Sequence, residues 1–264
     1  MAARAIWKAI LKIGAERLPL KLYSAVEDRT VHFNVLEKST MARITQHMVN
    51  PKTGEEVPND QIQKAYEVEP GIYVRLADED LERSKPKGSR EIEITRFVPP
   101  SHIDQQWYDR PYYLGPDEGD IAAYFALATA LENQKQEGIA HWTMRKSRYV
   151  GALRSEGGYL MLVTLRFAEE VLTADDLPRP TGRPPEAKEL KMAEQLVLAL
   201  EGEFRPGDYH DEYRERVMKF IEAKAKGLKP RLRIVARKTE TTSLADTLAA
   251  SLKAAKGAKE KAIA

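Results

Sequence analysis

Apolar and polar residues alternate along much of the first 167 positions, which is the period of a β-strand. In residues 1–13 one face carries Ala5, Trp7, Ala9, Leu11 and Ile13, and the other carries Arg4, Ile6, Lys8, Ile10 and Lys12. Further strands are expected at Leu18–Tyr23, Val31–Val35, Arg90–Val98, Ile139–Met144, Tyr149–Leu153 and Tyr159–Phe167. Because Pro19 has no N–H to donate, we expect its strand to begin at the edge of a sheet.

A β-hairpin is expected within Tyr66–Leu76, because Pro70 and Gly71 suit the central positions of a type II turn. The strand Tyr159–Phe167 is apolar enough to be buried on both faces. These strands together predict a β-dominated core.

In other segments the apolar period changes to that of a helix. Helices are expected at Asp78–Arg83, Asp120–Gln136, Glu186–Glu201 and Asp208–Lys226. In the second of these, Asp120 is the expected N-cap, Gly138 the stop, and the buried stripe consists of Ile121, Tyr124, Phe125, Ala128 and Leu131. Gly202 and Gly227 are expected to end the last two helices. The whole pattern predicts an α+β fold.

The stretch from Leu36 to Tyr66, which we call the arm, follows neither period. Its apolar residues are few, Pro51, Gly54 and Pro58 punctuate it, and it is far longer than the usual connection between strands. From position 38 to position 54 it contains lysine, arginine and histidine but no acidic residue. The residues alone leave two interpretations open, a solvated surface loop or a protruding arm that holds a polyanion.

The net charge of +2 over 264 residues conceals an uneven distribution. Residues 227–264 carry nine basic and three acidic groups, whereas residues 1–226 carry 33 basic and 37 acidic groups. A net-acidic body can still bind a polyanion where its cations share one surface, because the relevant field acts within a Debye length of about 8–10 Å. Three clusters qualify, namely the arm, the group Arg4, Lys8, Lys12, Arg17 and Lys21, and the group Arg145, Lys146, Arg148 and Arg154.

The basic C-terminal tail, residues 227–264, differs from the rest of the chain. It is expected to be flexible up to Thr242, after which Ser243 can cap a short amphipathic helix at about 243–256. Leu244, Leu248 and Leu252 recur every four residues in this helix. A helix of this length cannot bury its own leucines, so it is either a peptide for the groove of a partner or a frayed end. The expected domains are a core at 1–226, with its last helices at about 186–226, and this tail.

No catalytic signature is found in the sequence. The phosphate-binding glycine motifs and the nucleophile elbow are absent, there is no cysteine, and the histidines do not fall into metal-ligand spacing. A metal nuclease using Glu55 and Glu56 or Asp175 and Asp176 is one alternative, but adjacent carboxylates on a strand point apart. We therefore expect a protein that is not an enzyme and binds no metal or cofactor. With no membrane-spanning run and no signal peptide, a cytoplasmic location is expected.

Several short strings stand in order along nearly the whole chain. They are Ala5-Ile-Trp, Leu18-Pro-Leu-Lys-Leu-Tyr-Ser-Ala-Val-Glu-Asp, Val31-His-Phe-Asn, Gly54-Glu-Glu-Val-Pro, Asp109-Arg-Pro-Tyr-Tyr-Leu, Met192-Ala-Glu-Gln-Leu, Asp208-Tyr-His-Asp-Glu-Tyr-Arg-Glu and Ile221-Glu-Ala-Lys. Together they closely resemble the bacterial Ku family. The resemblance implies a homodimer whose β-barrels and long arms close a ring around double-stranded DNA ends for non-homologous end joining. It also implies that the tail engages the ATP-dependent DNA ligase D.

On this resemblance the DNA contacts are to phosphates, which carry no sequence preference. The expected contacts in the arm are Lys38, Arg43, His47, Lys52 and Lys64. Those of the cradle beneath the duplex are Lys8, Lys12, Arg17, Lys21, Arg145, Lys146 and Arg148. Glu55 and Glu56 would repel phosphate, so we expect them on the outer side of the arm. The dimer interface is expected to use barrel strands and the helices at 186–201 and 208–226.

The chain departs from the family's pattern in three places. Trp7-Lys8-Ala9 stands where members often have Trp-Ser-Gly, and Ala65 stands where glycine is expected. Asn50 and Thr53 occupy the positions of a C-x-x-C pair that some members have, so no zinc site is expected in the arm.

A rival function is an adaptor that touches nucleic acid only through its basic tail. End dependence of DNA binding distinguishes this adaptor from the ring.

Overall fold

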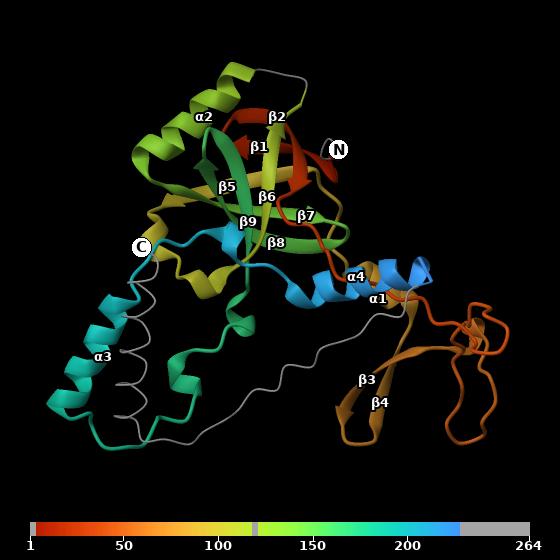
Figure 1. Ribbon diagram of the computed structural model, residues 1–264. Helices are drawn as coiled ribbons and strands as arrows, with labels where there is room; N and C mark the ends of the chain where they lie inside the picture. Colours follow the sequence, from red (N-terminus) through yellow and green to blue (C-terminus); the bar gives the residue numbers. More distant parts are fainter. Residues whose placement is uncertain (1–3, 118–120, 228–264) are drawn as a thin grey trace. The chain divides into compact units, whose positions relative to one another are not determined.

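The structure is a computed structural model that describes residues 4–117 and 121–227 (Figure 1). The chain divides into two compact units, residues 1–176 and residues 177–264. The first unit contains a closed β-barrel, a separate two-stranded sheet and two helices, and the second contains two further helices in its described part. The predicted α+β fold with a β-dominated core and a barrel is confirmed.

The barrel closes in the strand order β1-β2-β6-β9-β8-β7-β5 (Figure 1). Its strands are β1 (Trp7–Ile13), β2 (Glu16–Ser24), β5 (Glu91–Val98), β6 (Tyr108–Pro116), β7 (Glu137–Met144), β8 (Ser147–Glu156) and β9 (Tyr159–Leu165). Neighbouring strands are antiparallel except β1 and β5, whose parallel pairing closes the barrel. Closure pairs every strand on both sides, so the barrel has no free edge.

The predicted alternation in β1 is observed, because Ala9 and Leu11 are buried in the barrel core. The core also contains side chains from each of the other barrel strands, among them Leu20, Leu22, Ile92, Ile94, Leu114, Ala140, Leu153, Leu160 and Leu162. In β9 residues 160–164 are all buried, as expected of a strand covered on both faces. Burial of this apolar surface is the main term that stabilises the barrel.

Helix α2 (Ile121–Gln134) packs against β8 and β9. Its Tyr124 hydroxyl donates to the carbonyl of Leu114 at 2.6 Å and accepts from the N–H of Leu160 at 3.0 Å. Leu114 and Leu160 are register partners on β6 and β9, so this one buried hydroxyl links the helix to both strands by hydrogen bonds. Desolvation raises the pKa of the Tyr124 hydroxyl, which keeps it protonated for this role.

The predicted stripe of α2 is wrong for Ile121 and Phe125, which are exposed. Tyr124, Ala128 and Leu131 form a narrow buried i, i+4, i+7 row, beside which the half-buried Leu127 also packs against the core. The prediction of Gly138 as helix stop is also wrong, because the helix ends at Gln134 and Gly138 lies in β7. A Cβ at Gly138 would approach Phe97 to 3.0 Å, so close packing between β5 and β7 accounts for this glycine. The expected N-cap Asp120 lies outside the described residues.

One expectation about the first strands is wrong. Residues 31–35 form no strand, and Phe33 and Val35 are exposed. β2 pairs with both β1 and β6, but its residues up to Pro19 pair with β1 alone, so the strand begins at an edge as expected. Pro19 is tolerated there because its register with β6 begins one residue later, at Leu20, and its carbonyl still accepts from the N–H of Asp117.

The predicted hairpin consists of β3 (Lys64–Glu69) and β4 (Ile72–Leu76), which form a sheet of their own. Gly71 has a φ of 83°, as its position in a type II turn requires. Helix α1 (Asp78–Ser84) follows, in agreement with the expected helix. The arm before β3 contains two isolated bridges, Leu36 with Arg43 and Val49 with Glu56, each of which closes a small loop.

The second unit contains α3 (Ala187–Ala199) and α4 (Glu212–Ala225), and neither has a buried residue. α4 begins later than predicted, because Asp211 is the N-cap and accepts from the N–H of Arg214 at 2.9 Å. α3 ends at Ala199, before the predicted stop Gly202. Gly227 follows α4 with a φ of 73°, as expected of a C-terminal glycine. Short 3₁₀ turns lie at Asn59–Gln61, Pro100–His102, Gln105–Trp107, Ala168–Glu170, Ala174–Asp176 and Pro206–Asp208.

Candidate nucleic-acid interface

The four basic residues predicted on the first two strands are brought together by the register of β1 and β2. Lys8 lies directly opposite Lys21, and Lys12 lies directly opposite Arg17. Like charges at directly opposed positions destabilise a strand pair unless anions offset them. We call this group of four the β1–β2 cations.

Carboxylates from other strands offset each of these charges. Asp117, just after β6, lies 2.9 Å from Lys8 and 2.5 Å from Lys21. On β5, Glu93 lies 3.3 Å from Lys12, and Glu91 pairs with Arg17. The β1–β2 cations therefore form a row of surface ion pairs, and these neighbouring carboxylates largely compensate their positive charge.

The two lysines at Asp117 also change its acidity. Hydrogen bonds from Lys21 and from Lys8 lower the pKa of the Asp117 carboxyl from 3.8 to about 2. Asp117 is therefore ionised throughout the neutral range, and a DNA phosphate approaching these lysines would have to compete with it.

The second predicted basic group lies around the turn between β7 and β8. Arg145 and Lys146 have φ values of 51° and 67°, the two positive values that a two-residue hairpin turn needs. Glycine or asparagine usually occupies such positions, and each other residue there costs about 1–2 kcal/mol. Two long basic side chains are thus held at the turn at some cost in stability.

Lys146 contacts α1, since its Nζ lies 2.8 Å from Glu82, which also accepts from Lys85. Hydrogen bonds from Lys146 and then Lys85 lower the pKa of Glu82 to about 2. No carboxylate lies within ion-pair distance of Arg145 or Arg148 in the part of the chain that the structure describes. These two arginines retain their full charge for a ligand.

The remaining predicted DNA contacts lie in the arm. Lys38, Arg43 and Lys52 are exposed, and none has an ion pair within residues 4–117 and 121–227. Lys64, where the arm joins β3, lies 3.3 Å from Asp78. Lys64 therefore differs from Lys38, Arg43 and Lys52 in having an anionic neighbour.

His47 contacts the Glu56 carboxylate across the bridged part of the arm. The sequence predicted that His47 faces phosphate while Glu56 lies on the outer side. These two predictions cannot both hold, because one hydrogen bond places the two side chains together. Antiparallel pairing of Val49 with Glu56 brings Glu56 back to the neighbourhood of residue 47.

Several sequence-based expectations concern other groups. Among the described residues no three His, Asp or Glu side chains gather in a way that could hold a metal ion. No helix in the described ranges is long and apolar enough to cross a membrane. The expected ligase contacts Leu244, Leu248 and Leu252 and their helix lie outside the described residues.

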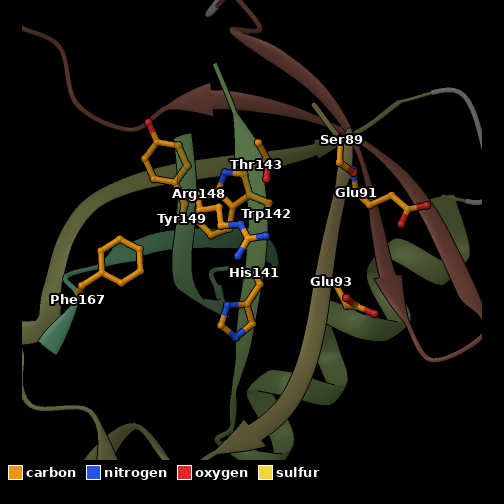
Figure 2. Close-up of a pocket in the computed structure, with 9 residues that line it drawn as sticks. All are labelled: Ser89, Glu91, Glu93, His141, Trp142, Thr143, Arg148, Tyr149 and Phe167. Carbon is orange, nitrogen blue, oxygen red and sulfur yellow. The ribbon is translucent and has the colours of Figure 1, made fainter. Parts of the chain in front are cut away.

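Sequence reasoning missed a cavity of about 420 Å³ beside β7 (Figure 2). It is lined by Ser89, Glu91, Glu93, His141, Trp142, Thr143, Arg148, Tyr149 and Phe167. Only Arg148 of these was a predicted site residue. The alternation of β5 could have indicated that Glu91 and Glu93 share a face, but their cationic partners come from β1 and β2, and only the barrel topology brings these strands together.

The chain is similar to known proteins over most of its length. Residues 13–192 match a family model described as the Ku70/Ku80 beta-barrel domain. A non-homologous end joining protein Ku from Coxiella burnetii is 39% identical over 230 residues, which cover 86% of this chain and 84% of that protein.

Two further relatives are matched over more of this chain. One from Anaeromyxobacter sp. is 40% identical over 258 residues, with 96% of this chain and 86% of the relative covered. One from Archaeoglobus fulgidus is 35% identical over 255 residues, with 96% and 100% covered. Both are also called non-homologous end joining protein Ku, and the structure contains a β-barrel, as the family model's description states. The chain therefore belongs to the Ku family.

Proposed function

We propose that this protein is a DNA-end-binding component of non-homologous end joining, in which two copies form a closed ring around double-stranded DNA. Its relatives are named for this process, and the arm carries the proposal. The arm is a long exposed excursion from a closed barrel, with basic residues that have no ion pair in the described ranges, and it leads into an apolar ribbon formed by β3 and β4. Neither property is explained by the needs of the barrel.

The ribbon of β3 and β4 supports a second copy as partner. Its apolar side chains are exposed, with Tyr66 at 66% and Tyr73 at 61%. An isolated two-stranded hairpin is marginally stable in water, and exposed apolar patches mark sites of protein association. A symmetric dimer, in which the same arm is offered by both copies, would cover this surface without a different partner.

The helices of the second unit support association in the same way. α3 and α4 have no buried residue, and Val197 is 71% exposed although the helix is amphipathic. Helices of 13 and 14 residues are at the limit of stability alone, so they depend on burial of their apolar stripe. We propose that these helices join the ribbon in the dimer interface.

DNA contacts in this proposal come first from Lys38, Arg43, Lys52, Arg145 and Arg148, the predicted cations that have no carboxylate neighbour among the described residues. Lys8, Lys12, Arg17, Lys21, Lys64 and Lys146 contribute less, because each first has to exchange an ion pair. Contacts to phosphate release counterions, so binding falls steeply with salt and has no base preference.

The mechanism is topological. A closed ring has no opening for the side of a duplex, so the protein loads at an end and slides inward. No bond of the DNA is made or broken by the protein, and holding an end is its contribution to repair.

The experiment that tests this compares one duplex in linear and covalently closed circular form, at the same moderate salt. Binding of the linear form alone supports the ring, and trapping on a linear duplex whose ends are blocked after loading supports threading. Equal binding of both forms contradicts the ring. If deletion of residues 228–264 then abolishes binding, the adaptor function through the basic tail replaces it.

We further propose that the tail recruits an ATP-dependent DNA ligase, ligase D, through Leu244, Leu248 and Leu252. Replacing the three leucines by serine should leave DNA binding unchanged and abolish stimulation of end ligation by the ligase. The matched control replaces Lys253 and Lys256 by serine, which changes the same segment without the leucines. Equal loss with both variants contradicts a leucine-specific contact.

A further inference from the structure

We propose that Lys146 is a positioning residue, which acts through Glu82 on α1 to hold the ribbon and the arm at a fixed angle to the barrel. The inference rests on the proposed function and deepens it, because it gives this lysine a role in ring closure in place of a phosphate contact. We call Glu82, Lys85 and Lys146 the α1 ion-pair cluster.

The segment that contains the arm leaves the barrel at one strand and returns at another. It leaves after β2, which ends at Ser24, and returns at β5, which begins at Glu91. α1 follows the ribbon on the way back (Figure 1). The contact of Lys146 with Glu82 joins this segment to the turn between β7 and β8, far along the chain. It is therefore a contact that can fix the direction of the segment.

Apolar packing does little to hold α1 in place. The helix has no buried residue. A cavity of about 580 Å³ lies where α1 approaches the turn between β7 and β8, and it is lined by Lys64, Asp78, Leu81, Glu82, Ser84, Lys85, Pro86 and Lys146. A helix with so little buried apolar surface depends on its polar contacts for its position.

Two lysines share the Glu82 carboxylate. Lys146 Nζ donates to Oε2 at 2.8 Å, and Lys85 donates to Oε1. Hydrogen bonds from Lys146 and then Lys85 lower the pKa of Glu82 to about 2, so the carboxylate is charged throughout the neutral range. Several charges that form one network hold a geometry better than an isolated surface pair does.

The backbone at Lys146 also indicates a use for its side chain. Its φ of 67° belongs to a turn position that glycine or asparagine usually occupies. Lysine is strained there, and strained residues are typical of sites where the side chain has a function. The contact that the structure shows for this side chain is the one with Glu82.

The other end of α1 is joined to the ribbon. Lys64, the first residue of β3, lies 3.3 Å from Asp78, the first residue of α1. Only Ala77 separates β4 from the helix. α1 is thus linked to both strands of the ribbon, so a rotation of the helix would also turn the ribbon and the arm that leads into it.

The two possible roles of Lys146 predict opposite effects of removing Glu82. If Lys146 bound a DNA phosphate, Glu82 would compete for it, and its removal would strengthen binding. If Lys146 positions α1, removal of Glu82 allows other orientations of the arm, and binding that needs a closed ring becomes weaker. Glu82→Gln therefore distinguishes the two roles by the sign of the effect.

The test measures binding of the full chain to a linear duplex by fluorescence anisotropy over a salt series. Glu82→Gln and Lys146→Gln should each weaken binding by about two- to fivefold, the range over which an exposed ion pair can shift an equilibrium. The slope of log affinity against log salt should change little in either variant. Both side chains are exposed, so the variants should fold, and unchanged thermal unfolding midpoints verify this.

Two controls are matched to these changes. Glu79→Gln removes the same charge from α1 at a position without an ion pair in the described ranges, and it should not weaken binding. Arg145→Gln changes the neighbouring residue of the turn, a proposed phosphate contact, and should make the salt slope shallower by about one. Lys146→Arg keeps the charge and should bind as the unaltered chain does.

A second measurement observes the orientation itself. The chain has no cysteine, so spin labels can be placed at Glu69→Cys in the ribbon and Ser101→Cys beside the barrel. Labelled chain mixed with excess unlabelled chain reports distances within one copy. Double electron–electron resonance should give a broader distance distribution with Glu82→Gln or Lys146→Gln, and an unchanged one with Glu79→Gln.

The outcomes separate this inference from the proposed function. Equal binding of linear and circular duplex by the unaltered chain contradicts the ring. End-dependent binding that Glu82→Gln leaves unchanged or strengthens overturns the positioning role alone. An unchanged distance distribution in Glu82→Gln overturns it as well, whatever the affinity.

Discussion

The arm and the outer face of β1 and β2 are both basic in sequence, yet the fold treats their charges differently. On β1 and β2 each lysine or arginine faces a carboxylate from β5 or from the end of β6. In the arm Lys38, Arg43 and Lys52 face solvent without such a partner in the described residues. The comparison shows that counting basic residues locates charge, whereas strand register decides how much of it is free for a ligand.

The barrel strand β1 and the ribbon of β3 and β4, which follows the arm, also differ in what their apolar residues do. β1 buries Ala9 and Leu11 in a core shared with every other strand of the barrel. β3 and β4 leave Tyr66 and Val74 exposed. The barrel therefore has the means to fold by itself, and the ribbon has apolar surface left for association.

The largest expected effect concerns this contrast in burial. Leu114→Ala should lower the free energy of unfolding by about 2–5 kcal/mol, because Leu114 is fully buried and its loss leaves a cavity. Val74→Ala in the ribbon, the matched control, should change it by less than about 1 kcal/mol and should instead weaken dimerisation. Urea unfolding and sedimentation measure the two quantities. Equal destabilisation by both would show that the ribbon is buried within one copy.

The next effect separates the two basic regions by DNA binding. Replacing Lys38, Arg43 and Lys52 together by glutamine should weaken binding to a linear duplex by about 100-fold at moderate salt, since each lost phosphate contact removes released counterions. The matched triple replacement of Lys8, Lys12 and Arg17 should weaken it by less than about threefold. Fluorescence anisotropy over a salt series measures both. If the second triple has the larger effect, the ion pairs of the barrel open on DNA.

A smaller effect tests that opening directly. Asp117→Asn frees Lys8 and Lys21 from their carboxylate, so it should strengthen duplex binding by about two- to fivefold and make it more salt-dependent. Glu16→Gln removes the same charge at the first residue of β2, where no ion pair is formed within the described ranges, and serves as control. The same gain in both variants would attribute the effect to net charge alone.

The smallest effect is in pH dependence. The lysines hold the pKa of Asp117 at about 2 in the folded protein, against 3.8 ordinarily, so the ionised form stabilises the fold above about pH 4. This contribution to stability is lost as the pH falls through the pKa of Asp117 in the folded protein. Urea midpoints of Asp117→Asn should therefore fall less than those of the unaltered chain between pH 4 and pH 2. Parallel curves in that interval would contradict the coupling.

Local signals predicted much of the fold. Period-two alternation located every barrel strand except β6 (Tyr108–Pro116), which was not predicted, and it wrongly predicted a strand at Val31–Val35, which lies in no strand of the structure. Pro70-Gly71 and Gly227 were located correctly, because a positive φ is a local requirement that glycine meets. The lengths of α3 and α4 were approximately right, whereas their first and last residues depended on caps such as Asp211.

The candidate site was less predictable, because its contacts join residues that are far apart in the sequence. The sequence by itself determined where basic residues cluster, that the arm is long and polar, and that the chain resembles Ku, because these are properties of neighbouring residues. Only the tertiary structure decided which of these charges are free. Asp117 meets Lys8 across more than 100 positions because β6 pairs with β2, and Glu91 meets Arg17 across 74 because β5 pairs in parallel with β1, and no local pattern specifies either pairing.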